Sequence, residues 1–263
     1  MTEILTQDNI PLMYVIQGSG PTIVFVLGYG MTLDEWPGKM ISTLVTSFRV
    51  ILYNHRGVSG VMNPAVKFTI PQGAEDLHDL VSLLADGPVH IVGYSMGGMI
   101  GLEFAIRYPE LLDHLVLIST NCGGSECIPC DDRVTEEMGK ELPDIDAYLE
   151  RAGRLLLTDS YRKKHPDPMS WFVDHGEVAD SKSVMEQYDA MATWEGVYSD
   201  LHVIRKPVLV ITGDRDIVSS PQNATIIAEA IPGAELVVVE DAGHGMIFQE
   251  PVMVGERIAR FLS

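Results

Sequence analysis

The sequence predicts an α/β fold in which a mostly parallel, twisted sheet is flanked by helices and carries a helical insertion. Short apolar runs typical of buried strands alternate with segments whose apolar residues recur at helical spacing. Because parallel strands need long crossover connections, this alternation favours a parallel sheet covered on both faces. The chain has 263 residues and is 46% hydrophobic, which is enough for one domain with a large core.

The elements of the first half follow from these patterns in order. Residues 2–17 are predicted to form two antiparallel strands joined by a turn at Asp8-Asn9. Next come a strand at 22–27, a helix near 34–46, a strand at 49–53 and a helix near 73–85. That last helix has an apolar stripe at helical spacing, formed by Leu77, Leu80, Val81 and Leu84.

The most informative motif is Gly93-Tyr94-Ser95-Met96-Gly97, which lies between a buried-strand run at 89–92 and a helical pattern at 96–107. Gly-x-Ser-x-Gly at a strand-to-helix junction is typical of a nucleophile elbow, a tight turn that exposes the serine hydroxyl. The two glycines avoid the clashes that a Cβ would cause there. A structural turn is the alternative, and the flanking strand and helix favour a nucleophilic Ser95.

Two later loops supply the partners that a nucleophilic serine needs. After a strand at 114–119, a second strand at 207–212 ends in Gly213-Asp214-Arg215-Asp216, and a third at 235–239 precedes a loop with His244. These two loops follow the carboxyl ends of strands, where open α/β sheets place their ligands. A serine becomes a good nucleophile when a neutral imidazole takes its proton and a carboxylate orients that imidazole.

These motifs resemble the α/β-hydrolase superfamily, and most of all its small esterases, enol-lactonases and cofactor-free haloperoxidases. The resemblance covers residues 10–120 and 200–262, through the segments Val24–Gly30, Tyr53–Gly60, Gly93–Gly98 and 207–262. It implies a hydrolase that works without a cofactor or a metal ion.

Carried over residue by residue, the resemblance implies Ser95 as nucleophile, Asp216 as acid and His244 as base. Asp214 is the alternative acid, but the family places the acid third after the glycine, at Asp216. The other histidines are expected to be structural. His90 and His114 are expected to be strand residues whose polar atoms are satisfied, and His55 to stand behind the reacting groups.

The chain departs from the family at two places. The first oxyanion loop reads Leu27-Gly28-Tyr29-Gly30, where the family commonly has His-Gly. Because the oxyanion hole is built from backbone N–H groups, the resemblance still implies Tyr29 and Met96 as donors. The second departure is Asn54-His55-Arg56-Gly57, which usually starts with aspartate. This segment more often braces the sheet than performs chemistry, so Arg56 is expected to be structural.

Strand patterns are absent between residues 121 and 203, where charged helical stretches such as 147–157 and 183–194 take over. We expect a helical cap at 121–203 inserted into a core domain of residues 1–120 and 204–263, with both ends of the cap emerging at the catalytic edge. Its bulky apolar side chains are candidate pocket walls or, alternatively, the core of the cap itself. The candidates are Trp171, Phe172, Met191 and Trp194.

Composition excludes several partners. A formal net charge of −19 disfavours nucleic acid and anionic membranes, which would repel the chain. The N-terminal residues lack the pattern of a signal peptide, so we expect a cytoplasmic protein of undetermined oligomeric state. The cysteines, at 122, 127 and 130, are expected to be ordinary thiols. A reversible Cys127–Cys130 disulfide and a zinc site are the alternatives.

The function expected from these observations is hydrolysis of short acyl esters or lactones through an acyl-enzyme. A thioesterase, a carbon–carbon bond hydrolase and a cofactor-free perhydrolase remain open, because the same three residues serve them. A non-catalytic binding module on this fold is the alternative outside enzymes, although such proteins often lose one of the three residues.

Overall fold

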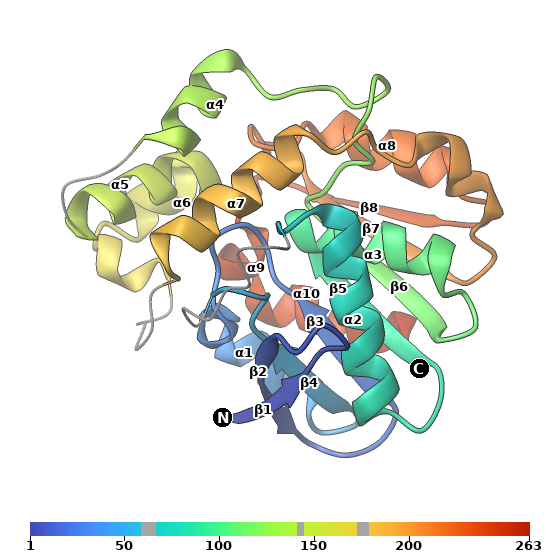
Figure 1. Ribbon diagram of the computed structural model, residues 1–263. Helices are drawn as coiled ribbons and strands as arrows, with labels where there is room; N and C mark the ends of the chain where they lie inside the picture. Colours follow the sequence, from blue (N-terminus) through green and yellow to red (C-terminus); the bar gives the residue numbers. More distant parts are fainter. Residues whose placement is uncertain (59–66, 141–144, 173–178) are drawn as a thin grey trace.

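The computed structural model describes residues 1–58, 67–140, 145–172 and 179–263. Residues 59 and 60 of the Tyr53–Gly60 segment, and residues 141–144 and 173–178 of the expected cap, lie outside the described residues. The described chain forms one eight-stranded sheet in the order β1-β2-β4-β3-β5-β6-β7-β8 (Figure 1). Its strands are β1 (Thr2–Leu5), β2 (Pro11–Gln17), β3 (Thr22–Val26), β4 (Arg49–Tyr53), β5 (Val89–Tyr94), β6 (Leu112–Ile118), β7 (Val208–Gly213) and β8 (Glu235–Val239).

The strands pair as the patterns predicted. β1 and β2 form an antiparallel pair, β2 pairs antiparallel with β4, and all later pairings in the sheet are parallel. The α/β fold class with a mostly parallel sheet is therefore confirmed. The helices that flank this sheet are α1 (Gly38–Leu44), α2 (Ile70–Leu84), α3 (Met96–Arg107), α8 (Pro221–Ala230), α9 (Met246–Gln249) and α10 (Pro251–Phe261).

Two apolar cores lie on opposite faces of the sheet. Residues Val24 and Val26 of β3 belong to the core shared with α2, α3 and α8, whereas Ile23 and Phe25 belong to the core shared with α1 and α10. This division follows from the alternation of side chains along a strand. Because both faces of β3 are covered, its sequence is a continuous apolar run rather than an alternating one.

The helix expected near 34–46 is divided in two. A 3₁₀ turn, η1 (Leu33–Glu35), comes first, and α1 begins only after Pro37. Trp36 has an extended conformation with ψ of 130°. The ring of a following proline clashes with a helical residue before it, which explains the interruption.

The segment between β6 and β7 is helical where it is described. It contains α4 (Asp132–Gly139), α5 (Ile145–Leu156), α6 (Asp159–Lys164), α7 (Ser181–Ala192) and two 3₁₀ turns, η2 (Pro168–Ser170) and η3 (Tyr198–Val203). Figure 1 shows α4 to α7 gathered at one end of the sheet.

One expectation about this segment is wrong. It leaves the sheet at the carboxyl end of β6 but does not return there, because β7 runs parallel to β6. The chain must therefore cross to the amino end of the strands before β7, and η3 lies along α3 and α8 on the way. Among the described residues, no helix is both long and apolar enough to cross a bilayer.

Candidate active site

Ser95 lies in the tight turn between β5 and α3 with an unusual backbone conformation, φ 53° and ψ −118°. The neighbouring glycines make this turn possible. A Cβ on Gly97 would stand 2.0 Å from the Val26 carbonyl oxygen, and one on Gly93 would stand 2.4 Å from the Gly97 carbonyl oxygen. The turn is held by the Ser95 N–H, which donates to the Ile118 carbonyl at 2.9 Å. The elbow sequence thus produces a strained serine at the carboxyl edge.

The structure brings Ser95, His244 and Asp216 into one chain of hydrogen bonds. The Ser95 Oγ lies 3.0 Å from His244 Nε2, and His244 Nδ1 lies 2.8 Å from Asp216 Oδ2. Because an ionised carboxylate only accepts hydrogen bonds, we assign the imidazole proton to Nδ1. The unprotonated Nε2 then accepts the hydroxyl proton of Ser95. Both His244 and Asp216 are buried.

The choice between the two aspartates is decided by their surroundings. Asp216 Oδ1 accepts backbone N–H groups from Val218 at 2.9 Å and Ser219 at 2.8 Å, which leaves Oδ2 for the histidine. Asp214 is exposed and lies 3.7 Å from the guanidinium of Arg215. The carboxylate that faces His244 is therefore the one third after the glycine.

Tyr94, the residue before the serine, packs against His244. Its ring centroid lies 5.4 Å from that of His244, and its hydroxyl donates to the His244 carbonyl at 3.3 Å. On the other side, the Gly245 N–H donates to the Leu156 carbonyl of α5 at 2.7 Å. The histidine loop is thus anchored both to the sheet and to the segment between β6 and β7.

The loop at 27–30 is stabilised by hydrogen bonds from residues 54–57, the segment that departs from the family sequence. His55 Nε2 lies 3.0 Å from the Leu27 carbonyl oxygen, and Asn54 Oδ1 accepts the N–H of Leu33 at 2.7 Å. Burial lowers the pKa of His55 to about 4, although the bond to Leu27 opposes this shift. His55 is therefore a neutral ring that donates to the loop. These contacts explain how asparagine and histidine serve at this position.

The two expected oxyanion donors differ in their surroundings: Met96 begins a helix, whereas Tyr29 lies in a loop. Met96 is the first residue of α3, so its N–H has no partner one turn back in that helix. Tyr29 lies in the loop after β3, with its ring centroid 6.2 Å from that of Tyr188 in α7. Burial raises the pKa of the Tyr29 phenol, which keeps the group neutral. Their role as oxyanion donors stays a prediction.

Gln187 of α7 was not singled out from the sequence. Its Oε1 accepts the Gly30 N–H at 2.8 Å, a contact between residues 157 positions apart. A glutamine within a helical pattern carries no signal of such a contact, since only the folded chain brings α7 to the loop of residues 27–30.

The four candidate pocket residues each contact a different part of the molecule. Trp171 is buried against Gly153 of α5, and Phe172 packs edge-on against Phe248 of α9 with ring centroids 5.1 Å apart. Trp194 follows α7 and donates from Nε1 to Glu103 of α3 at 2.8 Å. Its place along α3 follows from the crossing of this segment toward β7.

Met191 of α7 is partly buried and packs against the core that α2 and α3 share. The contacts of Met191, Trp171 and Trp194 are packing contacts, and the role of all four residues as pocket walls stays a prediction.

Arg56 is buried in an ion-pair network. Its Nε donates to Asp76 Oδ2 at 2.7 Å, and its Nη1 donates to Asp8 Oδ2 at 2.9 Å. Both carboxylates raise the pKa of Arg56 against the opposing effect of burial. The network joins α2 to the β1–β2 turn, which agrees with the structural role expected of this arginine.

The three cysteines are free thiols. Burial raises the pKa of Cys122 to about 11, so this thiol stays protonated. Within the described ranges, the cysteines do not gather into a metal-binding group.

Comparison with known proteins agrees with the fold. A family model described as the alpha/beta hydrolase fold matches residues 21–251. The chain belongs to the α/β-hydrolase family of enzymes. This family membership confirms the resemblance seen in the sequence.

Individual relatives are distant but cover more than nine-tenths of the chain. RutD of Agrobacterium fabrum, provisionally named a carbamate hydrolase, is 26% identical over 249 residues, which cover 92% of this chain and 93% of that protein. A solved structure of a thermophilic esterase from Thermogutta terrifontis is 26% identical with a TM-score of 0.83, covering 99% of this chain and 97% of that one. The enol-lactonase of Burkholderia xenovorans LB400 is 22% identical with a TM-score of 0.83 and 99% coverage of both chains, a likeness that shows the fold alone.

Proposed function

We propose that this protein is a serine hydrolase that cleaves short-chain carboxylic esters or lactones through an acyl-enzyme intermediate. The observation that carries the proposal is the chain of hydrogen bonds from Ser95 through His244 to Asp216, with distances of 3.0 and 2.8 Å. These lengths are those expected between a nucleophile, its base and the group that orients the base.

The proposed reaction begins when the Ser95 Oγ attacks the acyl carbonyl carbon and its proton passes to His244 Nε2. Backbone N–H groups of Met96 and Tyr29 stabilise the negative oxygen that forms. The tetrahedral intermediate then expels the alkoxide, which takes the proton from Nε2, and leaves the acyl group on Ser95. Asp216 holds the imidazolium during this exchange but keeps no proton.

Water completes the cycle. It attacks the acyl carbon and gives one proton to His244 Nε2, which returns that proton to Ser95 Oγ as the carboxylic acid leaves. Each step moves a proton only between atoms that the structure places in hydrogen-bond contact or that the substrate brings.

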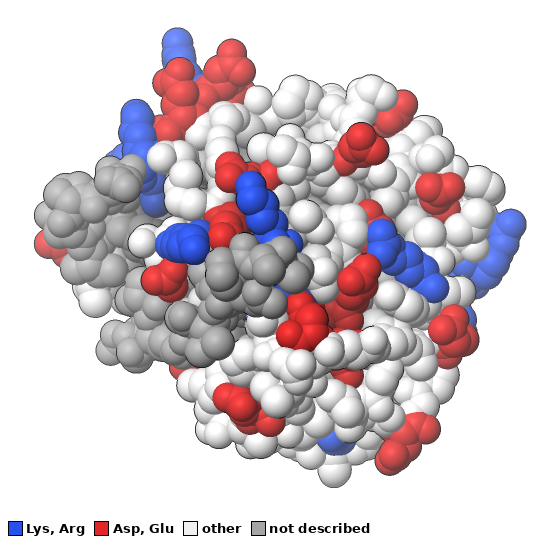
Figure 2. Space-filling view, in the orientation of Figure 1, with Lys and Arg blue, Asp and Glu red and all other residues white. Residues whose placement is uncertain are grey.

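We further propose that residues 121–203 act as a cap over the core of residues 1–120 and 204–263. Support comes from two contacts at the site, since α5 binds the histidine loop through Leu156 and α7 binds the oxyanion loop through Gln187. The partner expected is a small acyl compound. Acidic and basic side chains are interspersed on the face in Figure 2, which offers no support for a nucleic-acid surface there.

Labelling with a fluorophosphonate probe tests the proposal directly. The wild type should be labelled at Ser95 and hydrolyse p-nitrophenyl acetate, whereas Ser95→Ala should lose labelling and at least about three decades of turnover. Ser119→Ala is a matched control, because this serine follows β6 at the same edge of the sheet and is buried. Full activity of Ser95→Ala would contradict the proposal, and a folded wild type without labelling or turnover would favour a binding module.

A substrate panel separates the alternatives that share these residues. It should compare a short ester, a lactone, a thioester, a carbamate and a vinylogous diketone, with a perhydrolysis assay in parallel. We expect the highest kcat/KM for the short ester or the lactone.

A further inference from the structure

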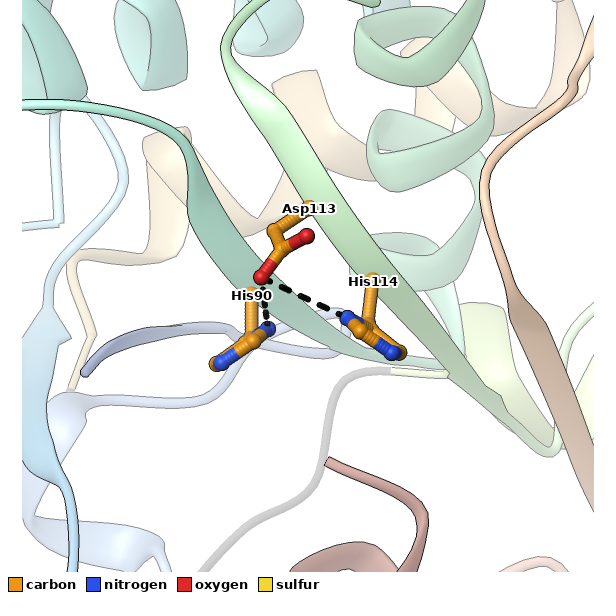
Figure 3. A group of neighbouring side chains, drawn as sticks. All are labelled: His90, Asp113 and His114. Atoms are coloured by element: carbon orange, nitrogen blue, oxygen red, sulfur yellow. Dashed lines mark ion pairs between the residues drawn. The ribbon is translucent and has the colours of Figure 1, made fainter. Parts of the chain in front are cut away.

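Two histidines and an aspartate converge at the amino end of the parallel strands, away from Ser95 (Figure 3). His90 is the second residue of β5, and Asp113 and His114 lie near the start of β6. Ser95 follows the end of β5, so about 16 Å of strand separates it from His90. The His90–Asp113–His114 cluster is therefore distinct from the candidate active site.

A β-bulge explains why the consecutive residues Asp113 and His114 of β6 both lie beside His90. The pairing of β5 with β6 steps from Val89–Leu112 to Ile91–Leu115, so His90 alone faces both Asp113 and His114. Consecutive side chains of a regular strand point to opposite faces, and a bulge re-aims one of them. Figure 3 shows the result, with the carboxylate of Asp113 directed toward both imidazole rings.

The distances within the cluster suit a shared ion better than hydrogen bonds. Asp113 Oδ2 lies 3.6 Å from Nδ1 of His90 and 3.5 Å from Nδ1 of His114, and one ligand atom from each of the three residues lies within 4.8 Å of the others. Neither Nδ1 atom has a hydrogen-bond partner in the part of the chain that the structure describes. Two ligands held about 2.1 Å from a tetrahedral zinc ion are about 3.4 Å apart.

His90 is the strongest indication of a missing ligand. The residue is only 4% exposed, and an unpartnered polar atom at that depth is rare in folded proteins. Burial lowers the pKa of His90 against the opposing effect of Asp113. From the sequence, the polar atoms of His90 and His114 were expected to have hydrogen-bond partners. This expectation is wrong for the Nδ1 atom of each residue.

The surroundings orient the rings and leave a route to solvent. Phe48 packs edge-on against His90 and Phe261 edge-on against His114, with ring centroids 6.0 and 5.4 Å apart. Asp113 is half exposed, and His114 lines an open hollow of about 410 Å³. The half-exposed Asp113 opens the cluster to solvent, which can supply a water molecule as a further ligand.

We propose that His90, Asp113 and His114 bind a divalent transition-metal ion of the zinc class at this edge of the sheet. Two imidazole nitrogens and one carboxylate oxygen suit Zn²⁺ and Co²⁺, whereas Mg²⁺ and Ca²⁺ prefer sites made of oxygen ligands. The ion links β5 to β6 and stabilises the folded chain, because it binds a site that the unfolded chain lacks.

Metal titration of the untagged protein tests this site. Equilibrium dialysis against Zn²⁺ should find one tight site per wild-type chain, Co²⁺ should give a visible absorption band, and both ions should raise the Tm. Asp113→Asn and His114→Gln should weaken binding by more than about tenfold, because they remove direct ligands. Asp113 is half exposed, so its isosteric replacement should leave the fold intact.

His202→Gln provides the matched control, since His202 is an exposed histidine in η3, which packs against α3 and α8 on the opposite face of the sheet. It should bind Zn²⁺ as the wild type does. The proposal is overturned if the wild type binds no stoichiometric Zn²⁺ at micromolar free concentration. It is also overturned if Asp113→Asn and His114→Gln bind with wild-type affinity, which would place the ion elsewhere, for example at His244.

A different observation leads to a second inference, about Gln187. Its side chain is almost fully buried, and its Oε1 accepts the N–H of Gly30, a residue with φ of 70°. Because the Gly30 N–H is a donor, the bonded atom must be the amide oxygen. Val184 and Tyr188 lie on the same side of α7 and also face this loop, opposite Gly30 and Tyr29 respectively.

We infer that Gln187 is a positioning residue, which holds the loop of residues 28–30 so that the Tyr29 N–H faces the oxyanion. This inference rests on the proposed function. In this role α7 sets the position of the Tyr29 N–H, whose hydrogen bond to the substrate oxygen becomes stronger in the transition state. The segment between β6 and β7 therefore influences turnover directly.

Kinetics of two Gln187 variants test this role. Gln187→Met keeps the length of the side chain but removes the acceptor, so kcat should fall at least about tenfold with little change in KM. Gln187→Glu keeps an acceptor oxygen and should recover most of that loss. Ser183→Ala, one turn earlier on α7 and equally buried, controls for disturbed packing and should retain turnover.

An unchanged kcat in Gln187→Met, or a loss that Gln187→Glu does not recover, would overturn the inference. The proposed function would stand in either case if Ser95→Ala still abolished turnover.

Discussion

The two edges of the sheet each bring a buried histidine against an aspartate, but the geometry differs. At the carboxyl edge, His244 Nδ1 lies 2.8 Å from Asp216 Oδ2, and both residues are enclosed. At the amino edge, His90 Nδ1 lies 3.6 Å from Asp113 Oδ2, and the carboxylate is half exposed and shared with His114.

The difference shows that residue type alone does not decide what a histidine–aspartate pair can do. A short contact to a carboxylate whose other oxygen is occupied by backbone N–H groups fixes one tautomer and suits proton transfer. A longer contact, with two Nδ1 atoms left unpartnered, leaves space between the groups and suits a bound ion.

The largest effect is expected from the carboxyl-edge carboxylate. Asp216→Asn should lower kcat by about four decades, because the amide cannot hold the productive tautomer of His244. Asp214→Asn should leave turnover close to the wild type, since this side chain is exposed. Rates on one activated ester decide the matter, and equal losses would show that the wrong carboxylate was assigned.

A third buried histidine, His55, contacts a backbone carbonyl instead of a carboxylate. Its pKa of about 4 in the folded protein lies below the ordinary value of 6.5. Between these two values only the unfolded chain binds the proton, so stability falls as the pH drops through this window, by about 3 kcal/mol for this group.

The variant His55→Gln keeps a donor for the Leu27 carbonyl but does not titrate. It should therefore lose about 3 kcal/mol less stability than the wild type between pH 6.5 and pH 4 in urea unfolding. The comparison cancels the opposite contribution of Glu35, whose pKa burial raises to about 7. Parallel stability curves for the two proteins would contradict the shifted pKa of His55.

A smaller effect concerns the acyl chain of the substrate. Each methylene that enters an apolar pocket adds about 0.8 kcal/mol until the pocket is full. We expect the highest kcat/KM for p-nitrophenyl esters of about two to six acyl carbons, measured below the solubility limit of each ester. A maximum at about twelve carbons or beyond would indicate a tunnel instead of a small pocket.

The smallest effect on turnover is expected from replacing the cysteines. A Cys122/Cys127/Cys130→Ser variant should keep its esterase turnover and bind Zn²⁺ as the wild type does, because neither edge uses a thiol. Its stability should fall by about 1–3 kcal/mol, since Cys122 is buried in the core. Loss of zinc binding in this variant, with Asp113→Asn unaffected, would move the metal site from the sheet edge to the cysteines.

The elements of the chain differ in how closely the sequence predicts them. The parallel strands and the elbow helix were predicted within about two residues, because a strand covered on both faces is a continuous apolar run and the elbow has a specific motif. The break at Pro37 and the return of the chain to the amino end before β7 were missed. Both follow from the sequence, because Pro37 disfavours a helical Trp36 and a strand at 207–212 parallel to the one before it requires a return to the amino end.

By itself, the sequence determined the α/β class, the family and the order of serine, acid and histidine, since these depend on periodicity and motifs within short stretches of chain. Only the tertiary structure decided which aspartate faces His244, that Gln187 binds the Gly30 N–H, and that a bulge turns Asp113 and His114 toward His90. Those outcomes depend on contacts between distant segments and on strand register, and a register step of one residue changes which side chains meet.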